Sequence, residues 1–91
     1  MTSILFVVKL QNNKYYLGLS NNLTEIFNEH LYNKYNIEWM NLFKPLKILS
    51  ISYNYNFEML NNTVIEYMNT YGIENVRGGS YSNVLEQYWK L

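Results

Sequence analysis

Two strand-like runs near the N-terminus, separated by only a few polar residues, constrain the fold of this chain most. Residues 4–10 are largely apolar, and residues 15–19 follow after the short gap Gln11-Asn12-Asn13. Two such runs joined by a short turn that contains Asn are typical of a β-hairpin. Apolar residues occupy both alternations of the first run, which predicts a strand that is covered on both faces or lies centrally in a sheet.

A first helix is predicted directly after this hairpin. Asn22 and Glu25 have the spacing of a capping box, in which the first side chain accepts a backbone N–H at the start of the helix. Apolar residues continue at helical spacing, so we expect a helix over residues 23–34 with its apolar stripe on the sheet. Residues 35–43 show no regular pattern, and Trp39 is expected to anchor this segment.

A third strand and a second helix are predicted in the middle of the chain. Pro45 ends the irregular segment, and residues 46–52 are expected to form the third strand. Residues 53–56, Tyr-Asn-Tyr-Asn, are expected to form a turn. An apolar stripe with helical spacing then predicts a helix over residues 57–71. Gly72 is a stop signal and is expected to end this helix in a left-handed conformation.

The last part of the chain predicts a loop over residues 76–80 and a short C-terminal helix. Asn83 and Glu86 again have the spacing of a capping box, and the segment that follows carries Trp89, expected to be a packing residue. The whole chain, residues 1–91, is therefore interpreted as a single α+β domain. Its predicted core is a three-stranded antiparallel sheet in the order hairpin, helix, strand, helix, flanked by helices.

Composition excludes several classes of protein. Seven basic and seven acidic residues give a formal net charge of zero, which argues against a strongly basic nucleic-acid module and against an acidic tail. The chain has no cysteine, so it forms neither disulfides nor Cys-ligated zinc sites. No apolar run approaches the ~20 residues of a membrane span, and the N-terminus lacks the basic region of a signal peptide. We expect an intracellular, cytoplasmic protein without a membrane partner.

Tyrosine and asparagine are unusually frequent, and two interpretations of this bias remain open. The chain has ten tyrosines. The bias is typical of an A/T-rich coding genome. The alternative interpretation is a set of tyrosines that stack on nucleic-acid bases.

Several motifs resemble the GIY-YIG nuclease-like domain, in particular a small-domain branch common in large DNA viruses. The matching segments are residues 14–18 (Lys-Tyr-Tyr-Leu-Gly), Trp39 with residues 43–45, and residues 67–80. Residues 16–18 (Tyr-Leu-Gly) correspond to the YIG motif, the second half of the family name. His30 falls where the first helix of the family often carries a histidine. The resemblance extends over residues 4 to about 81.

The resemblance also shows where this chain departs from the family. Members of the family cleave phosphodiesters, which implies a tyrosine that activates water, one divalent metal held by Glu, and an Arg that faces the scissile phosphate. Here Phe6 aligns with the first tyrosine and Ile26 aligns with the catalytic arginine. The metal-binding Glu corresponds to Glu58, or to Asn61 in a slightly shifted register. Losing one preorganised donor of this kind typically costs about 10²–10³ in rate.

The remaining candidate residues each have two interpretations. Tyr16, His30 and Glu58 are the residual catalytic candidates, with Glu58 as a weak metal ligand. Lys14, Tyr16, His30 and Arg77 are the candidate nucleic-acid contacts. The structural alternatives are a strand tyrosine packed on the first helix for Tyr16 and a hydrogen-bonded histidine at the sheet edge for His30. For Glu58 the alternative is a carboxylate favoured by the helix dipole. Arg77 either belongs to an anion-binding nest or pairs with a carboxylate beside a turn.

Three functions follow from these observations. The missing Arg and Tyr predict a catalytically degenerate GIY-YIG endonuclease-like domain, kept as a nucleic-acid-associated or protein-interaction module. It would need no cofactor, bind DNA or RNA weakly, and act in the host cytoplasm or the virus factory if the protein is viral. The second hypothesis is an active, divergent endonuclease that uses Tyr16, His30 and Glu58 with Mg²⁺ or Mn²⁺. The third is a structural protein that self-associates as a homo-oligomer, because Tyr is favoured at interfaces.

Overall fold

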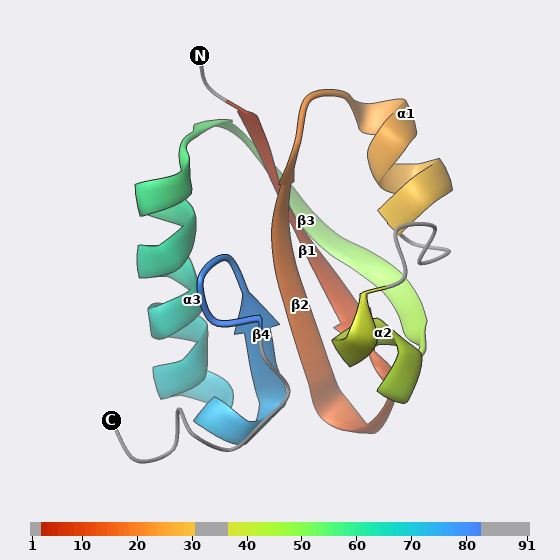
Figure 1. The fold of residues 1–91 in the computed structure, drawn as a ribbon, viewed down its shortest axis with the longest axis vertical. Coiled ribbons are helices and arrows are strands. Elements are labelled where there is room, and N and C mark those ends of the chain that lie inside the picture. The colour runs from red at the N-terminus through yellow and green to blue at the C-terminus, as the bar shows by residue number, and fades with distance from the viewer. Residues whose placement is uncertain (1–2, 31–36, 83–91) are drawn as a thin grey trace.

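A four-stranded mixed sheet forms the centre of the molecule (Figure 1). The structure is a computed structural model that describes residues 3–30 and 37–82. The antiparallel hairpin consists of β1 (Ser3–Leu10) and β2 (Lys14–Ser20), which confirms the predicted hairpin. The other edge of β1 pairs antiparallel with β3 (Pro45–Tyr55). The turn between β1 and β2 is a short helical segment in which Asn12 and Asn13 have positive φ, a conformation that Asn tolerates better than most residues.

The fourth strand corrects the predicted three-stranded antiparallel sheet. β4 (Val76–Gly78) pairs parallel with β2, so the strand order is β3-β1-β2-β4 and the sheet is mixed. The prediction of a loop over residues 76–80 is therefore wrong for its first three residues. β4 lies so close to β2 that a Cβ at Gly78 would collide with the carbonyl oxygen of Leu17, which explains the glycine at this position.

The first helical segment begins as predicted but does not continue as a regular α-helix. The Asn22 side chain accepts the backbone N–H of Glu25 at 2.7 Å and caps α1 (Leu23–Glu25). The chain then passes into a π-helical turn, η2 (Ile26–His30). The single α-helix expected over residues 23–34 is therefore wrong in type beyond Glu25, and its last four positions lie outside the described residues.

A short helix replaces the irregular structure that was predicted before β3. α2 (Glu38–Leu42) buries Trp39, whose indole N–H donates to the carbonyl oxygen of Tyr15 at 2.9 Å. Trp39 is thus the anchor that the sequence predicts. This bond ties a segment far along the chain to β2 close to the hairpin turn, because an indole N–H that is buried needs an acceptor.

β3 is longer than predicted because it passes through the expected turn. The strand runs to Tyr55, which pairs with Ser3, and the predicted turn at residues 53–56 is wrong. Asn54 has φ 64°, and the pairing with β1 shifts register at this point. A bulge therefore absorbs the turn-like residues without ending the strand.

α3 (Phe57–Tyr71) has the boundaries that the sequence predicts. The Asn56 side chain caps it by accepting the N–H of Met59 at 2.8 Å. The centre of the predicted apolar stripe is buried against the sheet: Leu60, Val64 and Met68. The two ends of the stripe, Phe57 and Tyr71, are exposed.

Replacement of Gly72 by alanine is expected to destabilise the fold by about 1 kcal/mol. Gly72 follows α3 with φ 100°, and an added Cβ would lie 2.6 Å from a carboxylate oxygen of Glu74. Its N–H donates to the Met68 carbonyl at 2.9 Å, a bond that alanine could keep, so the backbone conformation is the main cost. Urea unfolding monitored by circular dichroism measures the change, with Asn69→Ala in the same helix as the control. An unchanged midpoint for Gly72→Ala would contradict this account of the helix end.

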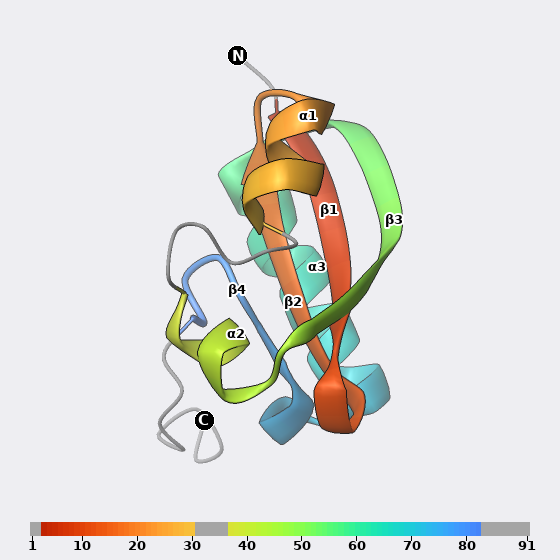
Figure 2. The ribbon, with the colours of Figure 1, turned by 90° about the vertical axis from the view of Figure 1, so that its right-hand side faces the viewer.

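The sheet separates two apolar cores, as expected for a first strand that is apolar on both faces. Figure 2 shows α3 on one side of the sheet and α1 and α2 on the other. The core under α3 contains Leu5, Val7, Tyr15, Leu17, Leu60, Val64, Met68 and Val76. The core under η2 and α2 contains Phe6, Val8, Leu10, Ile26, Trp39 and Met40. The predicted C-terminal helix with Trp89 lies outside the described residues. None of the helices within residues 3–30 and 37–82 has the length and apolar character needed to cross a membrane.

Candidate functional site

The two positions where the chain departs from the GIY-YIG pattern lie together in one core. Phe6 and Ile26 are both fully buried, and they belong to the same cluster as Val8 and Met40. The prediction that Ile26 packs inward is confirmed. The described neighbours of Ile26 in this cluster are apolar, so this part of the molecule is packed core.

Tyr16 lies on the same face of the sheet as Phe6, with 6.2 Å between the centroids of the two rings. Burial raises the pKa of the Tyr16 phenol above its usual value near 10. The hydroxyl therefore keeps its proton at neutral pH more firmly than a tyrosine in water does. This environment disfavours Tyr16 as a general base, because a base must lose its proton before it can accept another.

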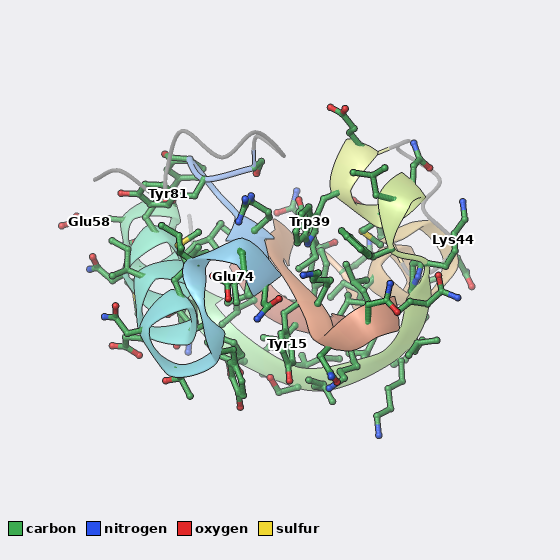
Figure 3. The ribbon with its side chains drawn as sticks, turned by 90° about the horizontal axis from the view of Figure 1, so that it is seen from below. Tyr15, Trp39, Lys44, Glu58, Glu74 and Tyr81 are labelled. Atoms are coloured by element: carbon green, nitrogen blue, oxygen red, sulfur yellow. The ribbon has the colours of Figure 1, made fainter. Side chains whose placement is uncertain are left out.

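Glu58 lies on the other side of the sheet from Tyr16. It is in the first turn of α3, which packs on the core opposite to that of Phe6. Figure 3 shows its exposed side chain on the outer side of α3, directed away from the sheet. The structure therefore does not bring Tyr16 and Glu58 together. His30 ends η2, and the predicted role of its side chain lies outside what the structure describes.

Asn61, the alternative position for the metal-binding residue, has a structural role. Its side-chain oxygen accepts the backbone N–H of Ser80 at 2.9 Å, and its amide donates to the Ser80 hydroxyl at 3.0 Å. These bonds fasten α3 to the turn after β4. Within the described part of the chain, no group of three or more His, Cys, Asp or Glu side chains could hold a metal ion. The residues offered by the resemblance therefore do not fit a metal site next to Tyr16.

Arg77 is the largest fully buried side chain, at 1% exposure. It lies in β4 directly opposite Tyr16 on β2, so the structure brings these two candidates together. Its guanidinium group donates to the carbonyl oxygens of Ile73 and Val76 and lies 4.7 Å from the centroid of the Trp39 ring. The predicted loop arginine is thus a strand residue stacked under α2.

Lys14, another predicted nucleic-acid contact, is held at the end of the hairpin. Its ammonium group donates to the side-chain oxygen of Asn75 at 2.6 Å and to the carbonyl of Glu74 at 3.4 Å. It also lies 5.1 Å from the centroid of the Phe43 ring. These contacts join β2 to η3 (Ile73–Asn75) and to the end of α2.

A second group of residues, which is not among the sites predicted from the sequence, combines aromatic rings with positive charge. We call Tyr15, Tyr67 and Tyr71 the tyrosine cluster. Tyr15 stacks on Tyr71 with 4.5 Å between centroids and an interplanar angle of 28°, and Tyr67 meets Tyr15 edge-on at 6.2 Å. The ammonium group of Lys9 donates to the Tyr15 hydroxyl at 3.1 Å. The available signal was the spacing of two tyrosines one helical turn apart, on the side of α3 that faces the sheet.

Lys9 and Lys47, which we call the lysine pair, extend this cluster across the sheet. They are directly opposite each other in the pairing of β1 with β3, and Lys9 is in turn opposite Tyr15. Cross-strand partners point to the same face of a sheet. Two cations and a tyrosine therefore form one row across three strands, beside the C-terminal half of α3.

Comparisons of the chain with protein-family models, with curated proteins and with solved structures find no match. The resemblance to GIY-YIG domains therefore depends on the quoted motifs and on the order of the elements. Within the described residues, that order is an antiparallel hairpin, a helical segment, a strand and a long helix.

Proposed function

We propose that this protein is a GIY-YIG-like domain that binds nucleic acid without cleaving it. The observation that carries the proposal is the complete burial of Ile26 in an apolar core. This is the position where the resemblance calls for a cation that faces the scissile phosphate. A phosphate cannot reach a side chain at this position, and the stabilisation of charge that such a cation supplies is absent there.

The other groups near Tyr16 support the same conclusion. Phe6 is fully buried and carries no hydroxyl, and burial raises the pKa of the Tyr16 phenol, which further disfavours its ionisation. Arg77 is opposite Tyr16, which is the one feature that favours the competing hypothesis of an active nuclease. Its side chain, however, is buried and donates to backbone carbonyls, so it is shielded from a phosphate in solution.

Binding of nucleic acid, rather than association with itself, is favoured by the chemistry of the tyrosine cluster. Aromatic rings next to cations are the combination with which many proteins hold nucleic acid without sequence preference. The lysine pair adds positive charge to this surface, although the chain as a whole has a net charge of zero. We therefore expect weak binding that depends on salt.

A plasmid-nicking assay tests the absence of cleavage. Supercoiled plasmid is incubated with the purified protein in Mg²⁺ and, separately, in Mn²⁺, with Tyr16→Phe prepared in the same way as the comparison. We expect no nicking by the unmodified protein above the level of Tyr16→Phe. The reason is that the two groups missing at residues 6 and 26 each contribute about 10²–10³ in rate when present. Metal-dependent nicking that Tyr16→Phe and Glu58→Ala both abolish would overturn the proposal.

A further inference from the structure

The lysine pair is an unfavourable arrangement for the isolated domain. Lys9 and Lys47 are directly opposite each other on neighbouring strands, and like charges in this position destabilise a sheet. The Lys9 ammonium group also lies 4.7 Å from the centroid of the Tyr15 ring, a cation–π contact that holds it beside the tyrosine cluster. An anion placed between the two lysines would relieve their repulsion.

The tyrosine cluster supplies a rigid aromatic surface beside these charges. Tyr15 is buried and fixes the position of Tyr71 by stacking on it. Tyr67 contacts both other rings, with centroids 6.2 Å from that of Tyr15 and 5.5 Å from that of Tyr71, which holds it in the cluster. Tyr71 remains 45% exposed, so part of its ring is accessible to a planar ligand. A ring that is already held in place loses little conformational entropy when a ligand stacks on it.

We infer that the tyrosine cluster and the lysine pair together form a binding surface for single-stranded nucleic acid. An unpaired base stacks on Tyr71, and the phosphates next to it contact Lys9 and Lys47. This inference rests on the proposed function and names the surface and the form of nucleic acid that it binds. A single strand is favoured over a duplex because the faces of paired bases are already stacked on one another. Two lysines are also few for a surface that would bind a duplex through its phosphates alone.

The inference predicts a specific dependence on salt and on two side chains. Fluorescence anisotropy of labelled oligothymidylate, oligouridylate and a DNA duplex gives the Kd of the full chain for each. With two phosphate contacts to a single strand, log Kobs should fall against log salt with a slope of about −1.4. Lys47→Ala removes one contact and should bring the slope to about −0.7. Tyr71→Leu keeps an apolar side chain on Tyr15 but removes the ring, and should raise Kd about fivefold or more.

Two matched variants serve as controls for this experiment. Tyr53→Ala removes a tyrosine that is 59% exposed and lies outside the tyrosine cluster. Lys44→Ala removes an exposed lysine that points away from Tyr15 (Figure 3). Both should bind like the unmodified protein. Thermal unfolding of all four variants checks that each is folded at the temperature of the assay.

The possible outcomes separate the inference from the proposed function. Single-strand binding that Tyr71→Leu and Lys47→Ala both leave unchanged would overturn the inference and leave the proposed function standing. Equal affinity for the duplex and the single strands would also overturn it. If the folded protein binds none of the three probes at low salt, both the inference and the proposed function fail. Weaker binding by both site variants, with both controls unchanged, supports the inference.

Discussion

Replacement of Arg77 by alanine is expected to remove about 3–5 kcal/mol from the free energy of unfolding, the usual cost of deleting a large buried side chain. The guanidinium group stacks on Trp39 and donates to two backbone carbonyls. Alanine would leave a cavity under the indole and would remove the donor from two backbone carbonyls, one of them in a buried hydrogen bond. For a domain of this size such a loss is a large part of the total stability, so the variant should be partly or wholly unfolded at ordinary temperature.

Arg77→Lys separates the effect of charge from that of shape. Lysine keeps the positive charge but lacks the planar fork that donates to two carbonyls while it stacks on an aromatic ring. We expect it to lie between the unmodified protein and Arg77→Ala in urea unfolding monitored by circular dichroism. Lys44→Ala, at an exposed position, should change the free energy of unfolding by less than about 0.5 kcal/mol. A loss below about 1 kcal/mol for Arg77→Ala would show that the arginine does not support the packing of α2 on the hairpin.

The elements that the sequence predicted correctly are those that local signals determine. The hairpin follows from two apolar runs and a turn that asparagine tolerates, and α3 follows from a helical repeat between Asn56 and Gly72. The starts of α1 and α3 each use an asparagine side chain that accepts a backbone N–H three residues later. These interactions connect residues that are close in the chain, so their patterns can be read without knowing the fold.

The elements that were not predicted from the sequence depend on partners far along the chain. β4 is only three residues long and exists because it pairs with β2. The local sequence of Val76–Gly78 does not predict this pairing. β3 continues past its apolar part because Tyr55 pairs with Ser3 on the other side of a bulge. Strand pairing is set by tertiary context more than by local preference.

In the candidate site, too, some features follow from the local sequence and others depend on contacts between distant parts of the chain. The inward orientation of Ile26 was predictable, because the residue lies on the apolar stripe of its helix. The partners of Arg77 were not, because they require both the parallel pairing of β4 and the short helix that carries Trp39. The tyrosine cluster was not predictable either. It joins Tyr15 of the hairpin to two residues of α3, and sequence spacing alone does not say which face of the hairpin α3 covers.

Introducing the two polar groups that the resemblance to GIY-YIG domains calls for, with Phe6→Tyr and Ile26→Arg in one chain, is expected to cost several kcal/mol of stability and to give no cleavage. The environment of Arg77 shows what a buried arginine requires in this fold: carbonyl acceptors and an aromatic face. Ile26 instead lies among apolar side chains in the core under η2 and α2. An arginine there would lose its hydration without gaining comparable partners.

Ile26→Val is the control that separates the effect of altered packing at residue 26 from the effect of a buried charge there. Ile26→Val removes one methylene from the same position and should lower the free energy of unfolding by about 0.5–1.5 kcal/mol. It therefore measures how much stability imperfect packing costs when no charge is introduced. If Ile26→Arg is much less stable than Ile26→Val in urea, the position is closed core and has no room for a catalytic cation. The opposite result would be a double variant that unfolds at the same urea concentration as the unmodified protein and nicks plasmid in Mg²⁺. That result would mean that the arginine reaches an open pocket, and that two substitutions separate this domain from an active nuclease.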